Sequence, residues 1–404
     1  NAIRNIIIIF IRAYQSIISI FKRRVSIISP YINFYMSIKL QILLKNIPYL
    51  LAPEVNSKVK GIDDEVRRMF QFTETTDGFE SFINKQIIKN IPKVYVESYD
   101  VFKRKALRLF PRETQVIYTS TAYQSNDAFK FWAAEKCYFG SKLIIGQHGG
   151  TFGLSYLNQT EDHQMNIADK FISWGWKSKA NKHVVPMPSI RLNGNSSMYS
   201  SQKDKGPFIH VLGGLPRYFY NFFSMPIAGQ FSNYLEDQII FLSELNKNNL
   251  KKVKIRQDIT SIKWGWDIEG VLKKNGFSDN IFNTNISLIN QLKGASLCIC
   301  THNGSVPLES LALNFPTIIF WDSNYYEIRA ESIEDMRMLK DVGIFYDCPK
   351  LAAGHINKIS DDISSWWKQE SIQNARYSFV NKYALNSDNS LNLLKEFLTK
   401  EANV

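Results

Sequence analysis

Apolar runs of strand length alternate with helical stretches along most of this chain, and no other feature constrains its fold as strongly. Such alternation is typical of a parallel sheet covered by helices on both faces. We therefore predict an α/β fold of two Rossmann-like domains with a cleft between them. The expected strands lie within residues 24–32, 93–100, 115–123, 141–150 and 169–176, and then within 208–216, 251–258, 296–304 and 316–322.

A polar segment between the two series indicates where the chain divides. Residues 191–207 are rich in Ser, Asn, Gly and Lys, which is typical of a linker. A chain of 404 residues also exceeds one ordinary core, so two large domains are expected. The predicted parts are residues 1–200, residues 201–375 and a C-terminal helical part, residues 376–404, that crosses back to the first domain.

The chain carries an excess of basic residues, with a formal net charge of +12. This excess suits an anionic partner such as a nucleic acid, a sugar nucleotide or a membrane surface, and a solvated basic face is the alternative. The sequence lacks the interleaved basic and aromatic residues that bind single strands, so we expect no nucleic-acid partner.

The first twenty residues are apolar but are interrupted by Arg4 and Arg12. These interruptions exclude a membrane span, while the helical spacing of the apolar residues predicts an amphipathic helix. The helix either packs on the fold or lies on an anionic membrane together with the basic run 22–24. In the second case the protein would work at the inner face of the cytoplasmic membrane.

The four cysteines show no CxxC spacing, and two of them lie in an apolar run. We expect reduced core thiols, a cytoplasmic chain and no metal site. The cysteines are Cys137, Cys298, Cys300 and Cys348.

Ligands of open α/β sheets bind at the carboxyl ends of strands, and four such ends carry candidate residues. The first end reads Gln147-His148-Gly149-Gly150. A glycine pair lets a ligand approach the backbone, and a histidine can bind an anionic group or carry a proton. A structural turn with a satisfied histidine is the alternative.

A polar loop is predicted after this first end, between two apolar runs. Glu161 in that loop is a candidate acid, base or nucleophile, whereas we interpret Asp162 as a solvated charge.

The predicted strand 251–258 ends in a basic and an acidic candidate. Arg256 and Asp258 lie two residues apart and therefore share one side of the strand. Arg256 could hold a carboxylate or phosphate, and Asp258 could serve at a reacting carbon. A local ion pair between them is the alternative.

The fourth end, after the strand 296–304, carries His302, Asn303 and Gly304. Ser305 is the expected N-cap of the next helix, whose free N–H groups would attract a phosphate. Glu309, one turn into that helix, could accept both hydroxyls of a ribose.

Together these motifs resemble the GT-B glycosyltransferases that use sugar nucleotides, and more narrowly bacterial transferases of surface-carbohydrate synthesis, including lipopolysaccharide, O-antigen and capsule. The stretches that carry the resemblance are "KFWAAEK", "IIGQHGGTFG", "ISWGW", "THN", "LESLALNFPTIIFW" and "GIFYDCPKLAAGHINKISDDISSWW". They span most of residues 115–385.

The arrangement is also similar to that of the retaining β-Kdo transferases, which use CMP-Kdo, the activated form of a 2-keto acid sugar. That resemblance implies that His148, Glu161 and Asp258 serve the reaction centre and that Gln147, Gly149 and Gly150 lie close to substrate. It also implies that the second domain binds the donor and the first faces a glycan or lipid-linked glycan acceptor. The implied donor-binding residues are Arg256, His302, Asn303, Gly304, Ser305 and Glu309.

No DxD motif is present, so we expect a metal-independent enzyme with a CMP-sugar as donor substrate and no further cofactor. Which carboxylate attacks, and whether the outcome is retention or inversion, is open at this stage. The alternatives are a CMP-glycerol-type polyol phosphate transferase and a non-catalytic carbohydrate- or nucleic-acid-binding protein. The missing GxGxxG pattern disfavours an NAD-dependent oxidoreductase.

Overall fold

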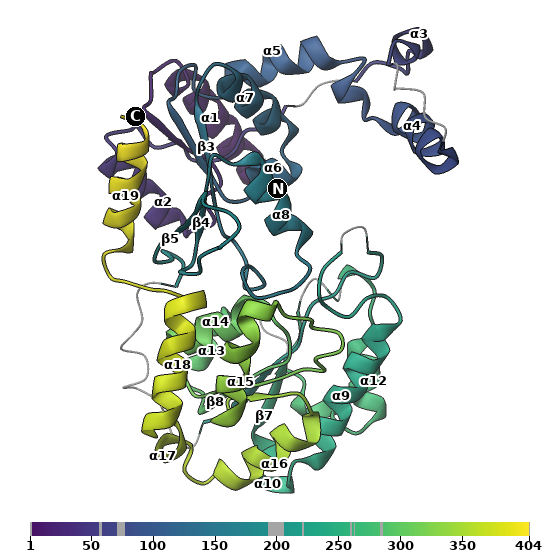
Figure 1. Cartoon of the computed structure of the whole chain (residues 1–404), viewed down its shortest axis with the longest axis vertical. Coiled ribbons are helices and arrows are strands. Elements are labelled where there is room, and N and C mark those ends of the chain that lie inside the picture. Colours follow the sequence, from purple (N-terminus) through teal and green to yellow (C-terminus); the bar gives the residue numbers. More distant parts are fainter. Residues whose placement is uncertain are drawn as a thin grey trace. The chain divides into compact units, whose positions relative to one another are not determined.

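Two five-stranded parallel sheets form the centre of the fold, which confirms the predicted α/β architecture (Figure 1). The strand orders are β1-β2-β3-β4-β5 and β10-β9-β8-β6-β7. The structure is a computed structural model that describes residues 2–55, 59–70, 77–192, 206–219, 222–258, 261, 263–282 and 286–403, with the backbone alone given for 2–8 and 12.

Contacts divide the chain into two compact units. The first comprises Asn1–Gly146 and Lys395–Val404, and the second comprises Gln147–Leu394. The predicted domain boundaries near residues 200 and 375, and the cleft between the domains, stay predictions. The predicted linker 191–207 lies outside the described residues from 193 to 205.

The strands of the first sheet are short and buried, as expected for strands covered on both faces. Parallel pairing joins β1 to β2 and β2 to β3, with Val25 opposite Val116 and Val116 opposite Lys142. The strands are β1 Val25–Ile27, β2 Val116–Thr119, β3 Lys142–Gly146, β4 Lys170–Ser173 and β5 Val184–Pro186.

Aromatic side chains pack the core of the first unit. Phe110 lies against Phe129 and stacks on Trp132, with 5.0 Å between the ring centroids of the stacked pair. The helices of this unit are α1 Ala2–Ile18, α2 Phe34–Leu43, α3 Asp64–Arg68, α4 Gly78–Asn90, α5 Tyr99–Leu109, α6 Ala122–Ser125 and α7 Asp127–Tyr138.

The predicted strand at 93–100 is wrong. Residues Lys93–Tyr95 form a short 3-10 helix, η1, and α5 begins at Tyr99. Tyr95 stacks on Phe131 of α7 and its hydroxyl donates to Asp127, 2.7 Å away. This packing against a helix replaces the sheet pairing that the alternating apolar residues suggested.

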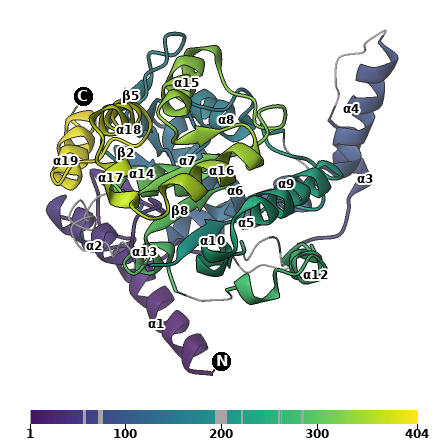
Figure 2. The same cartoon turned by 90° about the horizontal axis from the view of Figure 1, so that it is seen from below.

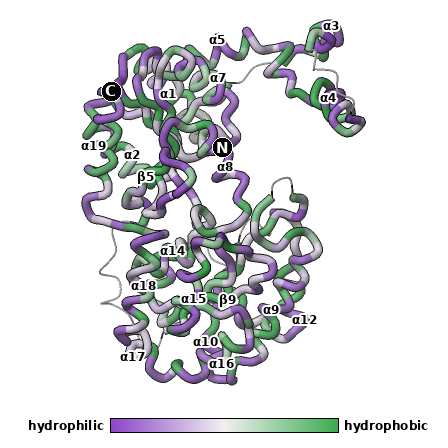
Figure 3. Tube along the Cα trace, viewed as in Figure 1, coloured by the Kyte–Doolittle hydropathy of each residue, from purple (hydrophilic) through white to green (hydrophobic). Residues whose placement is uncertain are grey.

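The second sheet matches the second predicted series, with one short strand, β10, added at its edge. Most helices carry both hydrophilic and hydrophobic residues, as expected for elements with one buried face (Figure 3). The strands are β6 Phe208–Val211, β7 Val253–Arg256, β8 Leu297–Cys300, β9 Thr317–Phe320 and β10 Phe345–Tyr346.

Helices cover this second sheet, and α9 and α16 lie side by side (Figure 2). The helical C-terminal stretch predicted at 364–384 is confirmed, although it divides into α17 and α18. The helices of the second unit are α8 Gln159–Ile167, α9 Gln230–Glu244, α10 Lys247–Lys252, α12 Ile268–Lys274, α13 Leu288–Leu292, α14 Ser305–Ala312, α15 Ile333–Asp341, α16 Pro349–Ile359, α17 Ile363–Trp367 and α18 Glu370–Tyr383, and α19 Ser390–Glu401 ends the chain.

The cysteine prediction holds in part. All four thiols are free, and Cys298 and Cys300 are buried in β8, but Cys137 and Cys348 are only half-buried. Their positions at a helix end and before α16 expose part of each side chain.

The predicted N-terminal helix is confirmed as α1. Gln15 and Ile18 are buried, whereas Ile9, Phe10 and Ile17 are exposed. The side chains of Arg4 and Arg12, which entered the membrane hypothesis, lie outside the described residues. None of the described helices is long and apolar enough to cross a membrane.

A buried histidine in β6 makes the stability of the second sheet dependent on pH. His210 is fully buried against Phe241 and Phe320, and its Nε2 donates to Oε1 of Gln238 at 2.9 Å. Burial lowers the pKa of His210 to about 4, so its ring is neutral near neutral pH.

We expect the free energy of unfolding to decrease as pH falls from about 6.5 towards 4, because the unfolded chain then binds a proton that folded His210 does not. Chemical denaturation across this range measures the slope. The His210→Gln variant should show a smaller slope than the wild type. Equal slopes in the two proteins would contradict the assignment of this titration to His210.

Candidate active site

Hydrogen bonds fix the carboxyl edge of the second sheet, where β6 and β8 end. The backbone N–H of Gly213 donates to the hydroxyl of Tyr234 at 2.6 Å, and that hydroxyl lies 2.6 Å from Oγ1 of Thr301. Thr301 in turn donates to the carbonyl of Val211 at 2.9 Å, so Tyr234 donates to Thr301. This series of bonds, which we call the Tyr234 chain, holds the loops after the two strands in one arrangement.

A glycine pair after β6 makes room for two candidate residues. A Cβ atom at Gly214 would lie 2.3 Å from Oδ1 of Asp258, and one at Gly213 would lie 3.1 Å from Cβ of His302. The structure therefore brings Asp258 and His302 to the same glycine turn, although they come from the ends of β7 and β8. We call these four residues the Asp258–His302 cluster.

His302 is held as a neutral ring. Its Nδ1 accepts a hydrogen bond from the N–H of Gly304 at 3.0 Å, so the proton of the neutral imidazole is on Nε2. Burial lowers the pKa of His302 to about 4, an effect that the Asp258 carboxylate opposes in part. His302 can thus donate a hydrogen bond from Nε2 near neutral pH without first binding a proton.

The helix after His302 begins one residue earlier than predicted. Ser305 is the first residue of α14, and Gly304 is its N-cap, without a side-chain hydrogen bond to the helix. The expectation of Ser305 as N-cap is therefore wrong. The N-cap position 304 leaves no space for a side chain, since a Cβ atom there would lie 2.7 Å from Nδ1 of His302. Glycine is the residue that fits this position.

The glycine at the end of the QHGG motif packs against this same turn. A Cβ at Gly150 would lie 2.0 Å from the carbonyl oxygen of Gly304 and 2.7 Å from the nitrogen of Ser305. A Cβ at Gly149 would lie 3.2 Å from the ring of Phe152, which can move aside. Gly150 therefore joins the QHGG loop to the start of α14.

His148 resembles His302 in its surroundings. The amide nitrogen of Gln164 lies 3.0 Å from Nδ1 of His148, and the Phe152 ring packs edge-on against the imidazole. Burial lowers the pKa of His148 to about 4. Both predicted histidines are thus neutral near neutral pH.

Gln147 is occupied by internal hydrogen bonds. Its amide donates to the carbonyl of Gly149 at 2.7 Å and accepts from Trp174 N and Trp176 Nε1, both at 2.9 Å. The side chain is buried. It fixes the backbone on which His148 stands.

Asn303 is also buried and joins neighbouring loops. Its amide nitrogen donates to Oγ of Ser155 and to the carbonyl of Ser224, each at 3.1 Å. The loop after β8, the segment around residue 155 and the segment around residue 224 are therefore held together by one side chain.

Glu161 lies in a helix and not in the predicted polar loop. Asn158 is the N-cap of α8 and accepts from the N–H of Glu161 at 3.1 Å. This capping pattern, Asn followed three residues later by Glu, is readable in the sequence and was missed.

The Glu161 carboxylate is fully buried and paired. Nη2 of Arg329 lies 2.6 Å from Oε1, and the N–H of Gly153 donates to Oε2 at 2.7 Å. Arg329 also donates from Nε to the carbonyl of Ser155 at 2.9 Å. Burial raises the pKa of Glu161, and Arg329 opposes this effect. The pair links residues 153–161 to residue 329.

The remaining predicted residues have partners of their own. Arg256 donates from Nη1 to the carbonyl of Ile286 at 2.8 Å and to Oε1 of Gln291 at 2.7 Å. Oε1 of Glu309 accepts from Nε and Nη2 of Arg191, at 3.2 and 3.1 Å. A ribose bound by Glu309 would share this carboxylate with Arg191.

The structure thus gathers some of the predicted residues into two groups, while Gln147, Arg256 and Glu309 have other partners. One is the Asp258–His302 cluster with the start of α14, and the other is the buried Glu161–Arg329 pair, and the contacts of Gly150 and Asn303 join the loops that carry them. Sequence reasoning missed the glycine pair 213–214, although its position after a strand repeats the pattern at 149–150. It also missed Tyr234 and Arg329, which no local motif marks.

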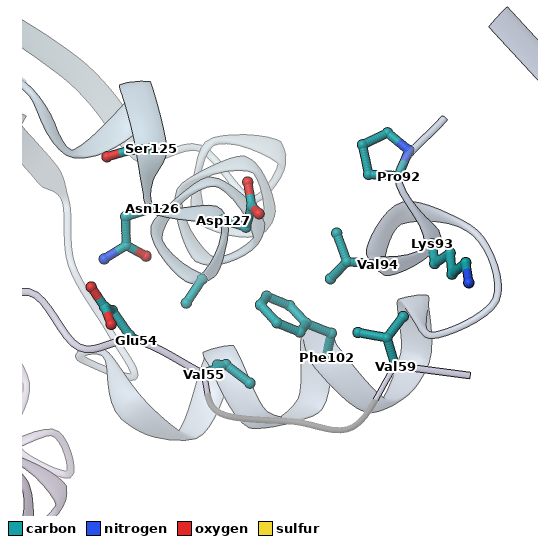
Figure 4. A pocket seen from close by; sticks show the side chains of 11 residues that line it. Glu54, Val55, Val59, Pro92, Lys93, Val94, Phe102, Ser125, Asn126 and Asp127 are labelled. Atoms are coloured by element: carbon teal, nitrogen blue, oxygen red, sulfur yellow. The ribbon is translucent and has the colours of Figure 1, made fainter. Parts of the chain in front are cut away.

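A pocket of about 500 Å³ lies in the first unit, and none of the predicted site residues lines it. Figure 4 shows Glu54 and Asn126 on one side and Phe102 and Val94 on the other. Its polar groups have structural tasks: Asn126 caps α7, and Asp127 accepts from Tyr95.

Comparison with known proteins supports a transferase. The family model described as LIC12162 family transferase matches residues 1–398. No curated protein sequence matches the chain significantly.

The fold is also similar to those of three solved structures. The wall teichoic acid polymerase TagF (H548A) has a TM-score of 0.41 at 12% identity, over 72% of this chain and 74% of that chain. MurG of Acinetobacter baumannii has a TM-score of 0.43 at 11% sequence identity, and the match covers 76% of this chain and 78% of that chain. WaaG, a glycosyltransferase involved in lipopolysaccharide biosynthesis, has a TM-score of 0.31 at 11% sequence identity, and the match covers 71% of this chain and 75% of that chain. Scores of this size establish no shared function.

We expect Gly150→Ala to destabilise the protein by about 1–3 kcal/mol more than Gly149→Ala. The first substitution places a methyl group against the backbone of Gly304, whereas the second meets only the Phe152 side chain. Equilibrium denaturation of the two variants measures the difference. Equal stabilities would show that the two loops are not in contact.

We expect Arg329→Met to cost about 3–5 kcal/mol, because it leaves the buried Glu161 carboxylate without its cation. Adding Glu161→Gln to this variant should restore part of the loss. Arg337→Met, which breaks an exposed ion pair with Glu334, is the matched control and should change stability little. No recovery in the double variant would refute the pairing as the cause.

Proposed function

Because the chain belongs to the LIC12162 family of transferases, we propose that it transfers a sugar from a nucleotide-activated donor to a glycan of the bacterial cell surface. The observation that carries the proposal is the Asp258–His302 cluster, which places a carboxylate and a neutral histidine at one glycine turn at the carboxyl edge of the second sheet. This edge is where doubly wound folds bind nucleotides.

We assign the donor phosphate to the turn at residues 302–305. Nε2 of His302 supplies one hydrogen-bond donor, and α14 begins there without a side-chain cap. The partial positive charge of a helix N-terminus favours an anion. A neutral histidine keeps its donor proton over the whole physiological pH range, so phosphate binding would not require protonation.

Asp258 is the carboxylate that we place at the reacting carbon. It could stabilise positive charge there or attack the carbon. Arg256 is proposed for the donor carboxylate and Glu309 for the ribose. His148 remains our candidate for the acceptor side or for proton transfer.

For Glu161 we propose a positioning role instead of a reacting one. Its carboxylate is fully buried, and both oxygens have partners in Arg329 and Gly153. A nucleophile or base would have to leave these partners. Holding the QHGG loop and residue 329 in place requires no such movement.

The finer proposal is that the donor is a CMP-activated 2-keto acid sugar such as Kdo and that the reaction needs no metal or other cofactor. It is supported by Arg256 near the cluster and by the resemblance to the retaining β-Kdo transferases. Transfer from a CMP-glycerol-type donor is the second candidate, because a histidine at a phosphate would serve it equally well.

A donor panel tests the proposal. Wild-type protein is heated with CMP, UDP, GDP or NAD, and a rise in Tm with CMP alone is expected. A rise with UDP alone would overturn the CMP assignment. Product analysis by ³¹P NMR then separates the candidates, since polyol phosphate transfer forms a phosphodiester and sugar transfer does not.

We expect Asp258→Asn to lower kcat at least about a hundredfold and to leave Tm unchanged, because the substitution removes charge at the reacting carbon without removing packing. Asp361→Asn, on the surface of the same unit, is the control. Activity near the wild-type value would refute the assigned role of Asp258. A CMP-induced rise in Tm that persists in the inactive variant would separate chemistry from donor binding.

A further inference from the structure

A second pocket of the first unit is strongly basic. It has a volume of about 680 Å³, and its lining includes the five cationic side chains of Lys22, Arg23, Arg24, Arg112 and Lys136 against the single carboxylate of Glu113. None of the residues predicted for the transferase site lines this pocket.

The topology of the sheet explains why these cations meet. Residues 22–24 directly precede β1, residues 112–115 precede β2, and residues 136–141 precede β3. Because the three strands are parallel, the segments before them lie at one edge, the amino edge. Backbone bonds hold two of them together, from Arg23 N to Glu113 O and from Arg112 N to Ser19 O, both at 3.1 Å.

Most of the positive charge is not neutralised within the protein. Lys22 pairs with Glu113 at 2.7 Å, and both side chains are exposed. Arg24, Arg112 and Lys136 form no ion pair with any carboxylate in the part of the chain that the structure describes. Three uncompensated cations around one pocket favour a polyanionic ligand or an anionic surface.

Arg23 gives the pocket a buried donor. Its side chain is only 5% exposed, and Nη2 donates to the carbonyl of Ile47 at 2.7 Å while the guanidinium lies over the Tyr49 ring. Nε of Arg23 has no hydrogen-bond partner among the described residues. A buried N–H of this kind is costly unless a ligand or water accepts from it.

Large apolar side chains surround the basic residues. Phe139 lines the pocket and is 74% exposed, and Tyr138 beside it is 84% exposed. Ile20 and Phe21 directly precede Lys22 in the sequence and are also exposed. Exposed aromatic residues next to lysine and arginine are typical of surfaces that enter the interface of a bilayer.

We propose that this basic pocket binds the phosphate headgroup of an anionic lipid and docks the protein on a membrane surface. The cations bind the headgroup phosphate, while Phe21, Tyr138 and Phe139 enter the apolar boundary beneath the headgroups. A free phosphate compound would use the cations but would gain nothing from exposed aromatic rings, so the apolar surroundings favour lipid.

The inference does not depend on the proposed function. Docking uses the amino edge of the first sheet, whereas the Asp258–His302 cluster lies at the carboxyl edge of the second. Failure of either proposal therefore leaves the other intact.

Co-sedimentation of the full chain with vesicles tests the proposal. Wild-type protein should bind vesicles that contain phosphatidylglycerol and not vesicles of phosphatidylcholine alone, with binding reduced by salt. The pocket variant Arg24→Gln, Arg112→Gln, Lys136→Gln should bind at least about tenfold more weakly. The control Lys247→Gln, Lys251→Gln, Lys274→Gln makes the same change of charge on the second unit and should bind like the wild type.

A second pair of variants tests the apolar part. Tyr138→Ser with Phe139→Ser should weaken vesicle binding several-fold, while Leu351→Ser with Tyr377→Ser, two exposed apolar residues of the second unit, should not. Thermal unfolding checks that each variant is folded. If the pocket variant has a Tm well below that of the wild type, the vesicle binding of the Tyr138→Ser, Phe139→Ser variant alone tests the proposal.

Three results would overturn the inference. The first is an equal loss of vesicle binding in the pocket variant and its control. The second is binding of glycerol phosphate as strong as vesicle binding and unchanged by the Tyr138→Ser, Phe139→Ser substitutions. The third is binding of an oligonucleotide without binding of anionic vesicles.

Discussion

The Tyr234 chain is the interaction on which the candidate site depends. Its hydrogen bonds run from Gly213 through Tyr234 and Thr301 to Val211, all inside the protein. They join the glycine turn after β6 to the loop after β8, the strand that pairs with β6. With them, Asp258 and His302 meet at a fixed place, and the neutral state of His302 follows from the burial that this arrangement creates. The chemistry that we propose is therefore a consequence of how two strand ends are joined.

Burial acts differently on two kinds of ionisable group, the three histidines His148, His210 and His302 and the carboxylate of Glu161. The histidines lose charge because burial lowers their pKa, even at His302, where the Asp258 carboxylate opposes this effect in part, and each neutral ring keeps one N–H donor. Glu161 keeps a cation beside it in Arg329. Burial thus produces neutral histidines that donate hydrogen bonds, and it also produces the fixed ion pair between Glu161 and Arg329.

The sequence predicted the fold well, while the roles of the predicted site residues stay predictions. Eight of the nine expected strands are present because parallel, doubly covered strands are continuous apolar runs, which are easy to recognise. The exception at 93–100 has the right apolar pattern, but Tyr95 finds its partner on a helix. Two short edge strands, β5 and β10, were missed.

The predicted site residues stay candidates, and the structure shows only which of them it brings together. Their positions after strand ends marked His148, Asp258 and His302 as candidates, whereas partners that are distant in sequence were missed. Arg329 lies 168 residues after Glu161, so nothing in the local pattern could reveal that this carboxylate is paired. The glycine pair at 149–150 was interpreted as an opening for a ligand, yet Gly150 is required by the close approach of its own backbone to that of Gly304.

The hydrogen bonds and the ion pair of Asn303 and Arg329 determine at which step the loops around them lose their conformational entropy. Asn303 ties the loop after β8 to Ser155 and to the segment at 224, and Arg329 ties Ser155 to Glu161. The loops are therefore ordered when the protein folds and not when a substrate arrives. Binding a donor then loses little conformational entropy, and more of the interaction energy appears as affinity. A preorganised site of this kind suits an enzyme that must capture a dilute substrate.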